Sequence, residues 1–183
     1  MILTGAEIEV QVEEGLIEIK PFLSENVGAN SVDLRLADEI LYYDFPSTGT
    51  LDCRKEPKTK KLKKNVDGSY TLFPNILYLG RTIERLGSSK YVPLVEGRSS
   101  IGRLGIQVHM TAGVGDLGFY GTITLEICVV HPIKVYPRSR ICQVLWVKSL
   151  GEERLYRGRY QGQQEVTPSK MHLLGYPPKG SKK

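Results

Sequence analysis

Long apolar runs are missing from this chain of 183 residues. No stretch approaches the roughly 18 consecutive apolar residues of a membrane span, so we predict no membrane partner. The N-terminus also lacks the basic start and apolar run of a secretory signal, and it carries several glutamates instead, among them Glu7 and Glu9. We therefore expect a cytoplasmic globular protein that is long enough to bury a core of its own.

Cysteine and histidine are scarce. The chain has three of each: Cys53, Cys128, Cys142, His109, His131 and His172. The cysteines are odd in number and far apart, which favours reduced thiols over a disulfide framework. The histidines are scattered and no Cys-x-x-Cys pair exists, so the sequence predicts neither zinc nor any other metal held by protein side chains.

Two common phosphate-binding motifs are also absent or misleading. The chain has no GxxxxGK[ST] sequence, which excludes a P-loop. Residues 113–118 do fit GxGxxG, but the next segment alternates like a strand where a dinucleotide-binding fold requires a helix. We therefore reject a Rossmann fold.

The net charge of +5 is concentrated in segment 54–64 and in the last five residues. A basic segment of this kind suits either a solvated hairpin or a nucleic-acid surface. No aromatic residue interrupts segment 54–64, whereas a surface that binds single strands needs aromatic rings for base stacking. We favour an exposed hairpin or loop and predict no nucleic-acid partner.

Short strands dominate the predicted secondary structure. Thr4 and Glu7 have the spacing of a capping box, which favours a short helix there although Ile8, Val10 and Val12 alternate as in a strand. Turn residues separate eight candidate strands, at 17–19, 31–43, 69–73, 76–79, 107–111, 122–130, 133–136 and 141–147. With no internal repeat or linker visible, we predict one all-β sandwich or roll over residues 1–170 and a flexible tail over 171–183.

The segment Arg98-Ser99-Ser100-Ile101-Gly102-Arg103-Leu104-Gly105 is the most informative part of the chain. Two arginines and two hydroxyls within six residues can hold a phosphate chain through several charge-assisted hydrogen bonds. Acids follow at Asp116 and Glu126. The combination predicts a nucleotide site at which chemistry takes place.

Glu126 lies in a segment with period-two alternation. The pattern places Thr122, Thr124 and Glu126 on one face of a strand and the apolar residues Ile123, Leu125 and Ile127 on the other. The polar face is either an ordinary solvated surface or the wall of a site, and the alternation alone leaves both interpretations open.

Several ordered motifs together resemble the dCTP deaminases of the dUTPase-like superfamily. They are Ser31-Val32-Asp33-Leu34-Arg35-Leu36, Glu96-Gly97 with the 98–105 segment, Thr111-Ala112-Gly113 with Asp116 and Gly118, Leu125-Glu126, Gln143, and Tyr160-Gln161-Gly162-Gln163 with Pro168-Ser169. The resemblance spans residues 1–170. It implies a distorted β-roll of the β-clip type with minor helix, assembled as a homotrimer with active sites between subunits.

The resemblance also implies roles for individual residues. Glu126, Ser99 and Arg103 match catalytic positions. Substrate-binding positions match Arg98, Ser99, Ser100, Ile101, Gly102, Arg103, Asp116, Thr124, Leu125, Glu126 and Gln143, and Tyr156, Arg159 and Gln163 match a closing tail. The implied ligands are dCTP, dUTP or dTTP as product or feedback ligand, and Mg²⁺ bound through the triphosphate.

Deamination without zinc requires a carboxylate to deprotonate the attacking water, and Glu126 is the candidate. The expected product is dUTP with ammonia. The alternative is a bifunctional enzyme that continues to dUMP and pyrophosphate. The resemblance of Thr111-Ala112-Gly113 to bifunctional relatives favours this alternative, in which Asp116 would activate a second water. A dUTPase without deaminase activity and a non-catalytic nucleotide-binding protein fit less well.

Three positions depart from the family pattern. Gly115 stands where relatives have a bulky apolar residue, and it predicts a less constrained backbone before Asp116. Cys142 replaces a glycine, and Arg159 replaces a lysine, which keeps the charge.

Overall fold

Antiparallel strands build most of the molecule, as the all-β prediction required. A computed structural model describes residues 1–45 and 49–175. Its helical elements are α1 (Gly5–Glu13), η1 (Ser24–Asn26), α2 (Ser99–Arg103) and η2 (Met171–Leu174). Its strands are β1 (Glu18–Lys20), β2 (Val32–Arg35), β3 (Leu41–Tyr43), β4 (Thr59–Lys61), β5 (Tyr70–Leu72), β6 (Tyr78–Gly87), β7 (Tyr91–Gly97), β8 (Ile106–Gln107), β9 (Tyr120–Val129), β10 (Ile133–Val135) and β11 (Arg140–Lys148).

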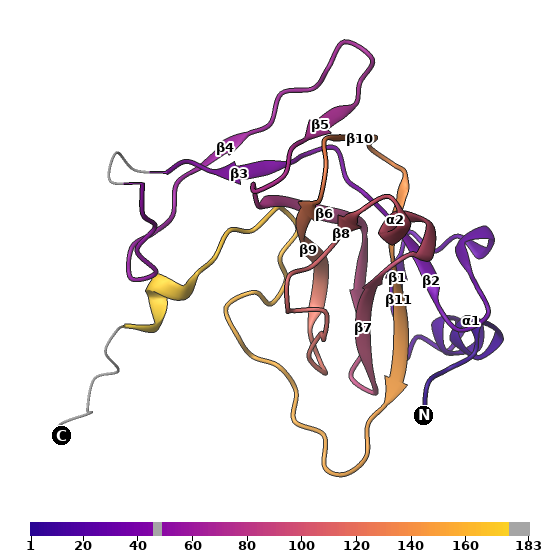
Figure 1. The fold of residues 1–183 in the computed structure, drawn as a ribbon. Helices are drawn as coiled ribbons and strands as arrows, with labels where there is room; N and C mark the ends of the chain where they lie inside the picture. The colour runs from indigo at the N-terminus through magenta and orange to yellow at the C-terminus, as the bar shows by residue number, and fades with distance from the viewer. Residues whose placement is uncertain (46–48, 176–183) are drawn as a thin grey trace.

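The strands form three sheets (Figure 1). The largest has the order β4-β3-β6-β9-β8 with β1 also paired to β6, the second is β2-β11-β7, and the third is the pair β10-β5. Side chains from all three sheets meet in one core that includes Trp146 of β11 and Leu125 of β9, both at most 1% exposed. No helix of the described residues is long and apolar enough to cross a bilayer.

The N-terminal helix is confirmed. α1 starts after Thr4, whose side chain accepts a hydrogen bond from the N–H of Glu7 over 3.3 Å. The fully buried Ile8 fixes the helix to the core. The capping bond and burial of one face outweigh the strand-like alternation that competed with the helix prediction.

The prediction of one continuous strand over residues 31–43 is wrong. The chain leaves β2 at Arg35 and reaches β3 only at Leu41, because Leu36 bridges to Thr82 and the N–H of Ala37 donates to the carbonyl of Arg81. These contacts carry the chain from the sheet of β11 to the sheet of β6. An apolar pattern cannot reveal such a change of partner, since both halves remain buried.

The sequence prediction shortened β6 and missed β7, and it gave β4 only as part of an exposed hairpin or loop. β6 runs to Gly87 and not only to Leu79. The charged Glu84 interrupts the apolar pattern in this part of the strand, and the structure buries it in an ion pair with Arg35. β7 was not predicted, since it contains Pro93, which has no N–H to donate. β7 accommodates it because only β11 pairs with it along its whole length.

Segment 107–111 forms a strand only at its start. β8 ends at Gln107, and the chain then turns across β9 as a loop. Its backbone hydrogen-bonds both the main chain and the side chain of Glu126. The predicted strand is therefore wrong beyond Gln107.

The basic segment lies in and beside the β3–β4 hairpin, as predicted. Its lysines pair with acids: Lys60 with Asp44 at 2.7 Å, Lys61 with Glu39 at 2.5 Å and Lys64 with Asp38 at 2.6 Å. These exposed pairs account for a good part of the local positive charge.

After β11, residues 149–170 run along the outside of β9 toward η2 (Figure 1). We call this segment the strap. Of the predicted flexible tail 171–183, η2 covers the first four residues, and residues 176–183 lie outside the described part of the chain.

Candidate active site

A cleft of about 370 Å³ opens between β9, the loop 112–116 and the strap. Five residues predicted from the sequence line it: Asp116, Thr124, Glu126, Tyr156 and Gln163. The other lining residues are mostly apolar or glycine: Val95, Ala112, Gly113, Val114, Gly115, Phe119, Ile123 and Tyr160. We call this space the acid cleft, because it holds two carboxylates in largely apolar walls.

Glu126 is fixed at the wall of the acid cleft by the loop after β8. Its backbone N–H donates to the carbonyl of Val108, and its Oε2 accepts the N–H of Met110 over 3.0 Å. One carboxylate oxygen is therefore held by the protein. The neighbouring Leu125 points the opposite way and is 1% exposed in the core.

The alternation along β9 holds from Thr124 onward but fails before it. Thr122 is buried, and Ile123 lines the acid cleft, the reverse of the predicted faces. The pairing with β6 shifts register between Arg81 and Arg85, opposite this point. The hydroxyl of Thr82 then accepts the N–H of Ile123, in place of a backbone carbonyl.

Asp116 is exposed at the mouth of the acid cleft on a backbone that is held, not loose. The N–H of Gly115 donates to the carbonyl of Pro93 over 2.8 Å. A Cβ at Gly115 would lie 2.6 Å from Cγ of Pro93. The expectation of a less constrained backbone is therefore wrong, because this glycine is what lets the loop dock against β7.

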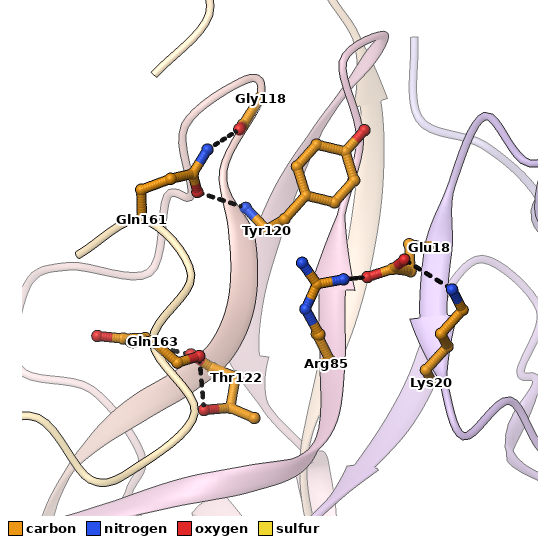
Figure 2. A network of polar contacts seen from close by, with 8 residues as sticks. All are labelled: Glu18, Lys20, Arg85, Gly118, Tyr120, Thr122, Gln161 and Gln163. Carbon is orange, nitrogen blue, oxygen red and sulfur yellow. Dashed lines mark hydrogen bonds and ion pairs between the residues drawn. The ribbon is translucent and has the colours of Figure 1, made fainter. Parts of the chain in front are cut away.

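The strap supplies the third wall and is bound along β9 (Figure 2). The side chain of Gln163 donates from Nε2 to the backbone carbonyl of Thr122 over 2.8 Å. The backbone carbonyl of Gln163 accepts the N–H of Thr122. Tyr156 packs edge-on against Phe119, with ring centroids 6.0 Å apart. Arg159 is not in the cleft, since it donates to the carbonyl of Lys170 over 3.0 Å.

Two titratable side chains lie near Glu126. The pKa of Tyr43 is raised by burial and, less strongly, by the charges of Tyr160 and Glu126, against a hydrogen bond from Ser169 that lowers it. The pKa of the Cys128 thiol is raised first by burial and then by the charge of Glu126. Both groups therefore stay neutral beside the carboxylate at neutral pH.

The predicted phosphate-binding residues lie elsewhere in the chain. Arg98, Ser99 and Gly102 line a separate space of about 420 Å³, together with residues 106–110. We call it the arginine cleft. Ser100 and Arg103 are exposed on α2 outside its lining, and Ile101 packs against the core. The turn at 108–110 lies between the two clefts, since it binds Glu126 and lines the arginine cleft.

Contacts with β2 and β11 hold Arg98 and the preceding Gly97 in place. Nε of Arg98 pairs with Asp33 at 2.8 Å, and Nη1 donates to the carbonyl of Arg140. Gln143 lies in neither cleft: its Oε1 accepts from the hydroxyl of Ser31 and its Nε2 donates to the carbonyl of Gly97. Gln143 therefore supports the Arg98 segment within this chain.

Sequence reasoning did not single out Phe119, Tyr160 and Val95 as wall residues, or Met110 as the donor to Glu126. Tyr160 belongs to a motif that the sequence analysis names, Tyr160-Gln161-Gly162-Gln163, and its position there was the available signal. Val95 and Met110 carried none, since the contribution of Met110 is a backbone N–H.

The fold is that of a deaminase-type β-roll. The structure matches the 2'-deoxycytidine 5'-triphosphate deaminase from Agrobacterium tumefaciens with a TM-score of 0.59 and 21% identity, over 81% of this chain and 48% of that chain. A family model described as dCTP deaminase-like matches residues 2–149, so the chain belongs to this family.

Curated relatives match almost end to end. A protein of Hathewaya histolytica named "dCTP deaminase, dUMP-forming" is 45% identical over 170 residues, which is 92% of this chain and 96% of the relative. A protein of the same name from Clostridium botulinum, strain Eklund 17B, is 46% identical over 173 residues, 94% of this chain and 97% of the relative.

Proposed function

We propose that this protein deaminates dCTP and hydrolyses the resulting dUTP in place, releasing ammonia, dUMP and pyrophosphate. The observation that carries the proposal is the presence of two carboxylates, Glu126 and Asp116, in the walls of one cleft. The names of the relatives favour dUMP as the product, which was the alternative in the sequence analysis, over free dUTP.

Deamination needs a base for water at C4 of the cytosine ring. Oε2 of Glu126 is occupied by the N–H of Met110, which leaves Oε1 to take a proton from the water. The hydroxyl adds to C4 while Glu126 returns the proton to N3. The proton of the new C4 hydroxyl then passes by way of Glu126 to the amino nitrogen, the C4–N bond breaks as the C4 carbonyl forms, ammonia leaves and the ring is uracil. Ser99 and Arg103 orient the water and stabilise developing charge in this proposal.

Hydrolysis of the triphosphate needs a second water at the α-phosphorus. Asp116 lies at the exposed mouth of the cleft, where a carboxylate can take a proton from that water. The new P–O bond forms as the bond to the β-phosphate oxygen breaks, and pyrophosphate leaves. The intermediate dUTP then has no need to dissociate.

The triphosphate is assigned to Arg98, Ser99, Ser100 and Arg103, whose charges and hydroxyls suit phosphate oxygens. Among the residues described, no three metal-ligating side chains gather. The cleft carboxylates are hard oxygen donors, the kind that Mg²⁺ accepts alongside phosphates and waters. We expect Mg²⁺ to arrive with the triphosphate, where it neutralises phosphate charge.

A complete site in this proposal comes from two chains. The carboxylates line the acid cleft, whereas Arg98 and Ser99 line the arginine cleft on the other side of the turn 108–110. A homotrimer in which the arginine cleft of one subunit meets the acid cleft of its neighbour would join them. The family resemblance motivates the trimer.

The test is one assay of dCTP and Mg²⁺ that resolves ammonia, dUTP, dUMP and pyrophosphate. Wild-type protein should form ammonia, dUMP and pyrophosphate in equal amounts with little free dUTP. Asp116→Asn should release dUTP instead, while Asp67→Asn, which alters an exposed carboxylate paired with Lys134, should behave as wild type. Stoichiometric dUTP from the wild type would establish a simple deaminase, and no ammonia would refute the proposal.

A further inference from the structure

Gln161 of the strap binds the backbone of the turn that enters β9 (Figure 2). Its Oε1 accepts the N–H of Tyr120 over 2.9 Å, and its Nε2 donates to the carbonyl of Gly118 over 2.6 Å. One side-chain amide thus supplies the donor and the acceptor that a neighbouring strand would supply.

The next strap residues continue this pairing along the same edge of β9. The N–H of Gly162 donates to the carbonyl of Tyr120 over 3.0 Å, and the N–H of Thr122 donates to the carbonyl of Gln163 over 2.9 Å. The approach is so close that a Cβ at Gly121 would lie 2.8 Å from the carbonyl oxygen of Gln163. We call these hydrogen bonds between residues 161–163 and residues 118–122 the zipper, and the side chain of Gln161 forms its first contacts.

The turn held by Gln161 belongs to the acid cleft. It follows Asp116 directly, and the N–H of Phe119 donates to the carbonyl of Asp116 over 3.1 Å. Phe119 in turn packs against Tyr156 of the strap. The Asp116 turn and the strap, two walls of the acid cleft, are therefore joined by the Gln161 amide, by the Phe119–Tyr156 contact and by the N–H of Tyr156, which donates to the carbonyl of Leu117 over 2.7 Å.

Gln161 itself is exposed and lines neither cleft. Its loss removes two hydrogen bonds at the surface and no packing in the core. The expected consequence is a poorly placed cleft wall in a chain that still folds, because surface positions of this kind contribute little to global stability.

We propose that Gln161 is a positioning residue that latches the strap to the Asp116 turn and so assembles the acid cleft before substrate binds. The inference rests on the proposed function for its kinetic consequence but not for the latch itself. The latch requires one donor and one acceptor on the same side chain. A carboxylate in its place offers acceptors only and repels the carbonyl of Gly118.

The decisive variant is Gln161→Glu, compared with Gln161→Ala and with Gln164→Glu as the matched control. Within the described residues, Gln164 is exposed and its side chain forms no hydrogen bond. At pH 8 we expect Gln161→Glu to lower kcat/KM for dCTP by about tenfold or more, since the hydrogen bond to the carbonyl of Gly118 is replaced by a repulsive contact between two acceptors.

Lowering the pH should restore Gln161→Glu and not Gln161→Ala. The protonated acid again offers one donor and one acceptor, and the carbonyl of Gly118 favours the protonated form. Recovery should therefore begin above the ordinary glutamate pKa of about 4.3. Rates are taken as ratios to Gln164→Glu at each pH, which removes the titration of the catalytic groups.

Hydrogen exchange at the N–H of Tyr120 supplies a readout that needs no catalysis. It should accelerate at least about tenfold in Gln161→Ala and stay at the wild-type rate in Gln164→Glu. Faster exchange in Gln161→Ala, together with a wild-type protein that does not turn over dCTP, would refute the proposed function and keep the latch. Wild-type exchange in Gln161→Ala, together with equal rates in Gln161→Glu and Gln164→Glu, would overturn the latch while the proposed function stands.

Discussion

Met110 donates its backbone N–H to Oε2 of Glu126 over 3.0 Å. This bond connects the acid of β9 to the loop that follows β8, and Met110 also lines the arginine cleft. The position of the carboxylate therefore depends on a main-chain group in the turn that separates the two clefts. A side-chain substitution at Met110 leaves this donor in place.

Glu126→Gln should abolish ammonia release, because the amide cannot accept the proton of the attacking water. General-base catalysis contributes about 10²–10⁴-fold, so the rate should fall at least that far. Triphosphate binding, measured by calorimetry with dCTP and Mg²⁺, should remain close to wild type. Residual deamination within about tenfold of wild type would remove Glu126 from the mechanism.

Mixing inactive Glu126→Gln chains with inactive Arg98→Ala chains should restore activity. Hybrid oligomers would contain some sites with an intact carboxylate from one chain and an intact arginine from another. The measurement is ammonia release after the chains are mixed and allowed to exchange, with each variant alone as the control. An active monomer by light scattering would contradict a shared site.

Gly115→Ala should destabilise the protein, because the new Cβ would lie 2.6 Å from Cγ of Pro93. We expect the free energy of unfolding to fall by about 1–3 kcal/mol. Adding Pro93→Ala removes Cγ and should recover part of the loss, which a double-mutant cycle measures. Gly102→Ala, where a Cβ meets nothing within 4 Å, is the control. Additive losses would show that the contact does not constrain the loop.

The fold class was predictable because it depends on local signals, whereas five members of the acid cleft were predicted from the family resemblance. Thr4 and Glu7 fixed the helix start, and the alternation within 122–127 correctly placed Glu126 on the face of β9 opposite Leu125. What failed depended on partners distant in the chain. The register shift opposite Ile123 and the turn after Gln107 both arise from backbone groups whose partners the sequence does not show.

The residues predicted to bind phosphate lie in a different part of the chain from the acid cleft. The residues from Arg98 to Arg103 gather on α2 and its entry, yet a single chain keeps them apart from Glu126. Motif spacing records which residues a site uses and not which chain supplies them. Asp33 lies in a motif that the sequence analysis recognises, but its ion pair with Arg98 joins β2 to the residue that follows β7, and the motif spacing does not show that contact.

Glu84→Gln should lower the free energy of unfolding by about 3 kcal/mol. Glu84 is 1% exposed and pairs through Oε1 with Nε of Arg35 at 2.6 Å, so the variant leaves a largely buried guanidinium without its counter-charge. Glu153→Gln breaks an exposed pair with Lys90 and should change stability by at most about 1 kcal/mol. Urea unfolding of the two variants compares them directly, and equal losses would contradict a special role for burial.

The hydrogen bonds between the strap and β9 also have a consequence during synthesis, because they form late and cover a strand edge on which chains can aggregate. The ribosome makes Tyr120 and Thr122 some forty residues before Gln161 and Gln163, which later cover their backbone groups. Until then β9 presents an open strand edge, the kind of surface on which chains pair with one another. A premature stop before Gln161 therefore yields a fragment in which this edge of β9 stays unpaired.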